Sequence, residues 1–133
     1  MKIFLDTNVL ASALTTRGLC AELFEVVLLS HELLISEPVL KELERILATK
    51  LGQPESITEG FRSLLRTEGC PVADDHPAPS LPDTADEPIV ASALAAGAKV
   101  FVTGDKALLK LKTVEQLPII SPRELWERLS AGE

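Results

Sequence analysis

The stretch that decides the fold is Ile3-Phe4-Leu5-Asp6-Thr7-Asn8-Val9-Leu10, in which an apolar run ends at an acid and a helical pattern begins. Residues 2–5 are typical of a short buried strand, and a helix is expected over about 8–14. Asp6 therefore stands where the chain turns from strand to helix. An acid at such a turn can cap the helix, because aspartate is a favoured N-cap residue, or it can bind a ligand.

The same alternation of strand and helix continues along the chain. Further helices are expected over 19–29, from a cap at Ser36 to Gly52, over 55–68, over 85–96 and after Ser121, and further strands over 32–35, 99–103 and 118–120. Residues 70–73 could form a short strand, and 74–82, with three prolines, are expected to be a loop. Alternating strands and helices build a parallel sheet with both faces covered. The sequence thus predicts an α/β fold, a three-layer α/β/α sandwich with a central parallel sheet of four to five strands, in a single domain over residues 1–133.

Three more acids stand at similar points of the chain. Glu42 lies on the helix that follows the strand 32–35, Asp86 opens the helix over 85–96, and Asp105 follows the strand 99–103. In an open parallel sheet, the carboxyl ends of the strands border the crevice where ligands bind. Two carboxylates ~4 Å apart repel each other by about 4 kcal/mol at an effective dielectric near 20. Because carboxylate oxygens suit Mg²⁺ and Mn²⁺, the pattern indicates a metal-dependent enzyme that acts on phosphate.

Each of these acids also has a purely structural interpretation. Asp6 and Asp105 could cap the helices that follow them, and Asp86 lies in a first turn, where the helix dipole favours an acid. Thr84 and Glu87 have the T-x-x-E spacing of a capping box, which would account for Glu87 without a ligand.

Periodicity leaves one position open on the helix after Ser36. Glu42 and Glu44 flank its apolar stripe on opposite sides, each about 100° from the centre of the stripe. Either glutamate could therefore be a solvated boundary residue or the fourth acid of the site.

The charge balance counts modestly against a polyanionic substrate. The net charge is −7, and the chain has no Tyr and one Trp, so its overall field repels nucleic acid and little aromatic surface is available for stacking on bases. Contacts to a nucleic acid must rest on bound metal or on local cations such as Arg17, Lys41, Lys99, Lys106 and Lys110.

The sequence also bears on the compartment. It has only two cysteines, no signal-peptide apolar region at its start and no stretch approaching the ~20 apolar residues that span a bilayer. We therefore expect a soluble, cytoplasmic protein without a membrane partner.

Four motifs, in this order, resemble those of the PIN-domain nucleases and, within them, the VapC-type toxins. They are Ile3–Leu10, Ser36–Leu43, Asp83–Asp86 and Val102–Leu109, and the resemblance extends from Lys2 to about Leu129. It implies metal-binding and catalytic roles for Asp6, Glu42, Asp86 and Asp105, and so it favours Glu42 over Glu44. It also implies supporting roles for Asn8 and Thr103, with Asp83 as an additional acid. Glu87 departs from the family pattern, in which Asn or Asp often follows the third acid.

The same resemblance implies a function. It describes a metal-dependent endoribonuclease with Mg²⁺ or Mn²⁺ as cofactor, which hydrolyses single-stranded RNA to a 3′-hydroxyl and a 5′-phosphate. It further implies the toxin of a toxin–antitoxin pair, a cognate antitoxin protein as partner, and a homodimer. Asp6 and Asp105 are expected to be direct metal ligands because both close strands, and Arg17 or Lys106 would hold the substrate backbone.

Two other classes of protein stay open at this point. The segment Asp6–Leu10 resembles the D-x-D-x-[TV] opening of haloacid-dehalogenase-type phosphatases, with Asp6 as the nucleophile; those enzymes have a second aspartate where Asn8 stands. The other alternative is a catalytically silent module that keeps the PIN fold and only binds a partner protein.

Overall fold

A six-stranded sheet forms the centre of the computed structural model, which describes residues 1–72 and 75–132. In spatial order the strands are β3(Cys70–Pro71), β2(Glu32–Ile35), β1(Lys2–Leu5), β4(Val100–Val102), β6(Leu117–Ile120) and β5(Thr113–Val114). Neighbouring strands are parallel except for β5 and β6, which form an antiparallel hairpin. The predicted α/β fold is confirmed, but the sheet has six strands where four to five parallel strands were predicted, and one of its pairs is antiparallel. Strand β5 was not predicted, because two residues are too few to display a period.

Helices connect the strands, and they begin and end close to the predicted positions. They are α1(Thr7–Thr15), α2(Leu19–Ser30), α3(Glu37–Arg45) with the π-helical extension η1(Ile46–Lys50), α4(Glu55–Glu68), the 3₁₀ turn η2(Thr84–Asp86), α5(Glu87–Ala95), α6(Lys106–Leu109) and α7(Pro122–Ser130). Of the predicted short strand 70–73 and loop 74–82, Ala73 and Asp74 lie outside the described residues. Among the described residues, no helix is both long and apolar enough to cross a membrane.

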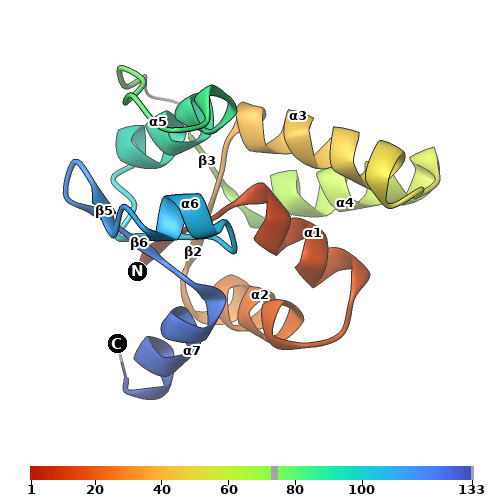
Figure 1. Cartoon of the computed structure of the whole chain (residues 1–133). Coiled ribbons are helices and arrows are strands. Elements are labelled where there is room, and N and C mark those ends of the chain that lie inside the picture. Colours follow the sequence, from red (N-terminus) through yellow and green to blue (C-terminus); the bar gives the residue numbers. More distant parts are fainter. Residues whose placement is uncertain (73–74, 133) are drawn as a thin grey trace.

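The chain reverses its direction of travel at the centre of the sheet. From β1 it moves outward through β2 to β3, and after α5 it returns to β4, on the other side of β1, and continues to β6. Because parallel crossovers are right-handed, the two directions of travel place connecting helices on opposite faces of the sheet (Figure 1). The β1–β4 pair is therefore the switch point, whose carboxyl ends border the position where ligands bind in such folds.

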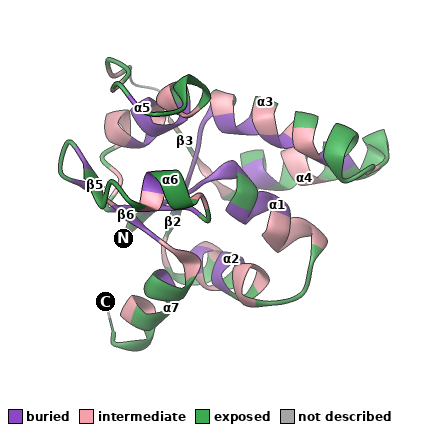
Figure 2. Ribbon diagram, in the orientation of Figure 1, coloured by how far each residue is buried: buried purple, intermediate pink, exposed green. Residues whose placement is uncertain are grey.

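The two central strands are also the most deeply buried part of the molecule. All side chains of β4, and those of β1 after Lys2, are fully buried, and the rings of Phe4 and Phe101 stack with their centroids 5.3 Å apart. Figure 2 shows buried segments at the centre of the molecule and, around them, helices that combine buried, intermediate and exposed residues. A rigid, apolar centre fixes the positions of the residues that follow both strands.

The N-cap predicted at Ser36 is confirmed by its position, but not by a side-chain bond. Ser36 occupies the N-cap position of α3 but makes no side-chain capping bond, and its buried hydroxyl has no hydrogen-bond partner among the described residues. Residue type therefore gave the correct helix start, while the expected hydroxyl bond is absent.

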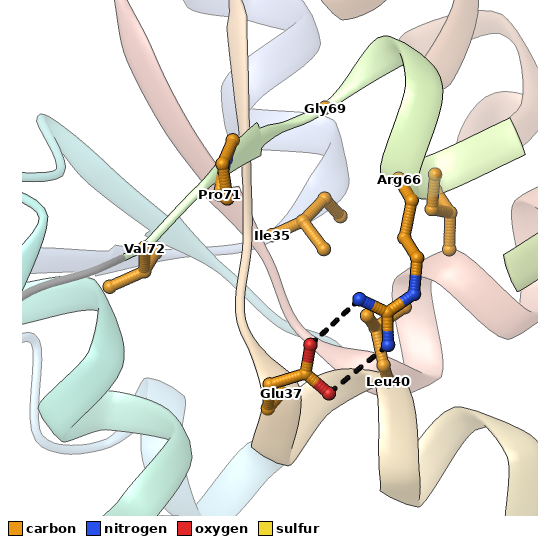
Figure 3. A pocket seen from close by; sticks show the side chains of 8 residues that line it. Ile35, Glu37, Leu40, Arg66, Gly69, Pro71 and Val72 are labelled. Carbon is orange, nitrogen blue, oxygen red and sulfur yellow. Dashed lines mark hydrogen bonds and ion pairs between the residues drawn. The ribbon is translucent and has the colours of Figure 1, made fainter. Parts of the chain in front are cut away.

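The edge of the sheet depends on the absence of a side chain at Gly69. A Cβ atom there would lie 2.4 Å from Cγ1 of Ile35 and 2.6 Å from the carbonyl oxygen of Leu65. Figure 3 shows Gly69 beside an apolar hollow of about 260 Å³, whose rim carries a bidentate ion pair between Arg66 and Glu37 with N–O distances of 2.9 and 3.2 Å. Glycine allows α4 to pass this close to β2 before the chain enters β3.

We predict that Gly69→Ala destabilises the protein by about 1–3 kcal/mol, the usual cost of overpacking. The matched control is Gly60→Ala, in the middle of α4, where an added Cβ meets nothing within 4 Å. That change should stabilise the helix by about 0.5–1 kcal/mol. Urea unfolding of both variants measures the two effects, and equal stabilities would contradict the packing argument.

Candidate metal-binding active site at the carboxyl edge of the sheet

Asp6 is the centre of the candidate site. It follows β1 directly, is only 4% exposed, and has both carboxylate oxygens engaged. The backbone N–H of Thr7 donates to Oδ1 at 2.8 Å, while Thr103 Oγ1 and Asn8 Nδ2 donate to Oδ2 at 2.7 and 3.2 Å. The bond from Thr7 is the helix cap that the sequence allowed for Asp6. The other two bonds join it to β4 and to the exposed side of α1.

Asp105 reaches the same edge of the sheet from β4. Its Oδ1 accepts a hydrogen bond from the N–H of Ala107 at 2.8 Å and so caps α6, and its own N–H donates to Thr103 Oγ1 at 3.0 Å. Asn8 Oδ1 accepts from the N–H of Gly104 at 3.1 Å, which ties the start of α1 to the end of β4. Thr103 and Asn8 thus each bond both to Asp6 and to the backbone of Gly104 or Asp105. Asp105 Oδ2 takes no part in these hydrogen bonds.

Asp86 stands at the junction of η2 and α5, half-buried. Its N–H donates to the carbonyl oxygen of Asp83 at 3.1 Å, and its side chain makes no capping bond. Asp83 is exposed, and its Oδ1 accepts from the N–H of Ala85 at 2.9 Å. The structure therefore makes Asp83 the cap of η2, while the Asp86 carboxylate accepts no backbone hydrogen bond from any residue that the structure describes.

The predicted capping box of Thr84 and Glu87 is wrong. The cap residue is Asp83, one position earlier. Glu87 does not return to the helix start but accepts a hydrogen bond from the N–H of Leu81 at 2.9 Å. The T-x-x-E spacing is a necessary but not a sufficient condition for the box, because a neighbouring aspartate competes for the same cap position.

The structure separates Glu42 from Glu44. Glu44 forms an ion pair with Arg62 of α4. Glu42 lies on the other flank of α3, half-buried, where its charge acts on both Asp6 and Asp86. Of the two glutamates that periodicity left open, only Glu42 is electrostatically coupled to the strand-exit acids.

We call Asp6, Glu42, Asp86 and Asp105 the acidic cluster. Burial raises the pKa of Asp6; the bonds from Thr103 and Thr7 oppose this shift, and the charges of Glu42 and Asp105 add to it. Burial, followed by the charges of four other acids, raises the pKa of Asp86 to about 6; those acids are Asp6, Asp83, Asp105 and Glu42. Four carboxylates from separate elements therefore share one electrostatic environment.

The acidic cluster fits a hard divalent cation by the chemistry of its donors. A carboxylate oxygen can accept two hydrogen bonds or ligands, so Asp6 Oδ1 keeps one free position and Asp105 Oδ2 is fully available. In the part of the chain that the structure describes, no three acidic, histidine or cysteine side chains lie close enough together to hold a metal. Asp86 and Glu42, which act electrostatically on each other and on Asp6, would be the further carboxylates available to such an ion.

A hollow of about 480 Å³ lies beside the cluster. Its lining includes Asn8 and Ser12 of α1, Cys20 of α2, and Gly104 and Asp105 after β4. The two cations considered for substrate binding, Arg17 and Lys106, are both exposed. Lys106 is the residue after Asp105, at the start of α6, and Arg17 lies in the connection between α1 and α2.

The fold and the site together define a doubly wound α/β domain with acids at its switch point. The family model described as "PIN domain" matches residues 2–107. The chain therefore belongs to the PIN-domain family, as its motifs predicted. No curated protein matches the sequence significantly.

Solved structures with the same fold are distant in sequence. VapBC2 from Rickettsia felis, bound to a DNA fragment from its promoter, has a chain 17% identical to this one with a TM-score of 0.66, covering 91% of this chain and 98% of its own. PAE2754 from Pyrobaculum aerophilum is 16% identical with a TM-score of 0.63, covering 98% of this chain and 96% of its own. FitAcB from Neisseria gonorrhoeae has a chain 18% identical with a TM-score of 0.55, covering 91% and 98%. At these identities the likeness concerns the fold.

We predict that Asp86→Asn stabilises the metal-free protein at pH 8 and leaves it unchanged near pH 4. The pKa of Asp86 is about 6 in the folded protein against 3.8 as reference, so the unfolded state releases this proton first. In the wild type, protonated Asp86 is fully retained below the reference pKa, and its stabilising effect is lost as the pH rises through 6. Asparagine resembles the protonated form at every pH, so the variant gains stability only where wild-type Asp86 is charged. Each kcal/mol added to the free energy of unfolding raises Tm by about 3–5 °C for a domain of this size.

Thermal unfolding in EDTA at the two pH values measures the effect. Glu25→Gln, on the exposed side of α2, removes the same charge far from the cluster and should show no such pH dependence. A Tm difference for Asp86→Asn that is equal at both pH values would contradict the assignment.

Proposed function

We propose that this PIN-domain protein is a metal-dependent endoribonuclease that cleaves single-stranded RNA with Mg²⁺ or Mn²⁺. The observation that carries the proposal is the buried carboxylate of Asp6 at the switch point, which is coupled to three further acids. Among the residues that the structure describes, none of these four acids forms an ion pair with a cation. Burial of several carboxylates costs stability unless a charge compensates it. Membership of the PIN family supports nuclease chemistry; the choice of single-stranded RNA rests on the resemblance to VapC-type toxins.

The four acids have two kinds of task in this proposal. A divalent cation, when bound, supplies an acidified water and neutralises charge on the phosphate. Asp6 and Asp105 would hold it with Oδ1 and Oδ2, respectively, the positions that their hydrogen bonds leave free. Asp86 and Glu42 would complete the site from α5 and α3 and take up the proton of the attacking water. Thr103 and Asn8 would keep Asp6 in place by their bonds to its Oδ2.

The substrate must approach an acidic protein, which limits where its backbone can bind. The hollow lined by Asn8, Ser12 and Asp105 opens beside the acidic cluster, and we propose that the scissile phosphate enters there. Exposed Lys106 adjoins Asp105, and exposed Arg17 follows α1. We propose that these two cations hold neighbouring phosphates, because local cations are the available counterweight to a net charge of −7.

The biological setting we propose is a toxin–antitoxin pair. The support is the fold shared with VapBC2 and FitAcB, the first of which was solved with promoter DNA. In this setting a cognate antitoxin would cover the acidic cluster, and the chain would act as a homodimer in the cytoplasm. The family match assigns the Asp6–Leu10 motif to a PIN domain, so no observation now favours the phosphatase alternative.

We predict Mn²⁺-dependent cleavage of single-stranded RNA, with 5′-phosphate and 3′-hydroxyl ends on the products. Asp6→Asn and Asp105→Asn should each lower the cleavage rate by about 100-fold or more, because each removes a carboxylate that would hold the cation, and the cation is what neutralises the phosphate charge. Gel analysis of a labelled RNA with and without EDTA measures both effects. Glu44→Gln, on the opposite flank of α3, is the matched control and should retain activity.

Full activity of either aspartate variant would overturn the proposed mechanism. Absence of both metal binding and cleavage in a folded protein would instead favour the silent protein-binding module. Thermal shift distinguishes these cases, since Mn²⁺ at ~100 times its Kd should stabilise the wild type by about 2.7 kcal/mol.

A further inference from the structure

We propose that Glu87 is a positioning residue, which fixes Asp86 by tying the segment before it into a closed loop. The proposal rests on the metal site of the proposed function, to which it adds a residue outside the acidic cluster. Its basis is a hydrogen bond of 2.9 Å from the N–H of Leu81 to Oε2 of Glu87. Because these residues lie on either side of Asp83 and Asp86, the bond joins the two ends of residues 81–87.

Contacts fix the closed segment, residues 81–87, at both ends and in its middle. The side chain of Leu81 is part of the hydrophobic core, at 9% exposure. Asp83 accepts from Ala85 through its side chain and from Asp86 through its carbonyl oxygen, at 2.9 and 3.1 Å. Glu87 itself is the first residue of α5. One end is therefore fixed by the core, the other by the helix, and the Leu81–Glu87 bond connects them.

Asp86 needs such support more than the other acids do. Thr7, Asn8 and Thr103 hold the carboxylate of Asp6 directly. The side chain of Asp86 makes no capping bond, so its position depends on its backbone. Repulsion from Asp6 and the other acids, together with burial, favours displacement of this carboxylate from the cluster when it is charged.

Glu87 does not act as a fifth acid of the cluster. One of its carboxylate oxygens is committed to the N–H of Leu81. Its charge is not among those that raise the pKa of its neighbour Asp86, although Asp83 three residues away is. Its role is therefore the acceptor bond and not the negative charge, and a neutral acceptor should serve equally well.

The test compares Glu87→Gln, which keeps a carbonyl acceptor for Leu81, with Glu87→Ala, which removes it. Isothermal titration with Mn²⁺ should give an affinity about tenfold weaker for Glu87→Ala and within about twofold of wild type for Glu87→Gln, the size expected when a supporting partner of a metal ligand is lost. In an Asp86→Asn background, Glu87→Ala should weaken binding no further. Amide hydrogen exchange at Leu81 and Asp86 in EDTA should accelerate in Glu87→Ala alone.

The outcomes separate this inference from the proposed function. Equal losses of affinity in Glu87→Gln and Glu87→Ala, or a further loss in the Asp86→Asn background, would make Glu87 a ligand or a charge and overturn the positioning role. Unchanged affinity and unchanged exchange in Glu87→Ala would overturn it as well. If the wild type fails to bind Mn²⁺, or if Asp86→Asn binds it equally well, the proposed site of the enzyme is wrong, whereas the exchange data still report on the closed segment.

Discussion

The hydrogen bond from Thr103 Oγ1 to Oδ2 of Asp6 joins residues 97 positions apart and ties together the ends of β1 and β4, at the edge of the sheet where the acidic cluster lies. A carboxylate that is 4% exposed must be compensated, and Thr103 can compensate it only if β1 and β4 are neighbours in register. The same threonine accepts the N–H of Asp105 at 3.0 Å. Strand pairing, the end of β4 and the start of α1 are thus all tied to one buried hydroxyl.

At Asp6 and Asp105 the observed capping role is compatible with the proposed metal-binding role. Asp6 and Asp105 each use one oxygen to accept a backbone N–H at the start of a helix. A carboxylate has about four acceptor positions, so capping leaves room for a ligand. The cost appears at Asp86, whose pKa is raised to about 6 by burial and by its acidic neighbours. Stability given up at a site of this kind is common where function needs a particular charge arrangement.

Much of the fold followed from short patterns, and the failures have local physical causes. Apolar runs bounded by Asp6 and Asp105 predicted β1, β4 and their helices correctly. Capping was predicted less well, because several polar residues in succession can each accept an N–H, and tertiary contacts choose among them. At η2, for example, the residue that caps the helix is Asp83 and not Thr84. The bond between Glu87 and Leu81 had no sequence signal, since the segment between them, Pro82–Asp86, is too short and irregular to show a period.

The sequence by itself determined the order of most strands and helices and placed Asp6 and Asp105 at the ends of the two central strands, because hydrophobic period and residue type act over a few residues. Only the tertiary structure decided which of the acids lie close enough to repel one another. The return of the chain through α5 put β4 beside β1 and so brought Asp105 to Asp6. Packing of α4 against α3 gave Glu44 the cation Arg62 and left Glu42 facing the other acids. Electrostatic coupling depends on the distance between charges in space. Helical periodicity within α3 indicates which side of the helix a residue lies on, but not how far it is from acids on other elements.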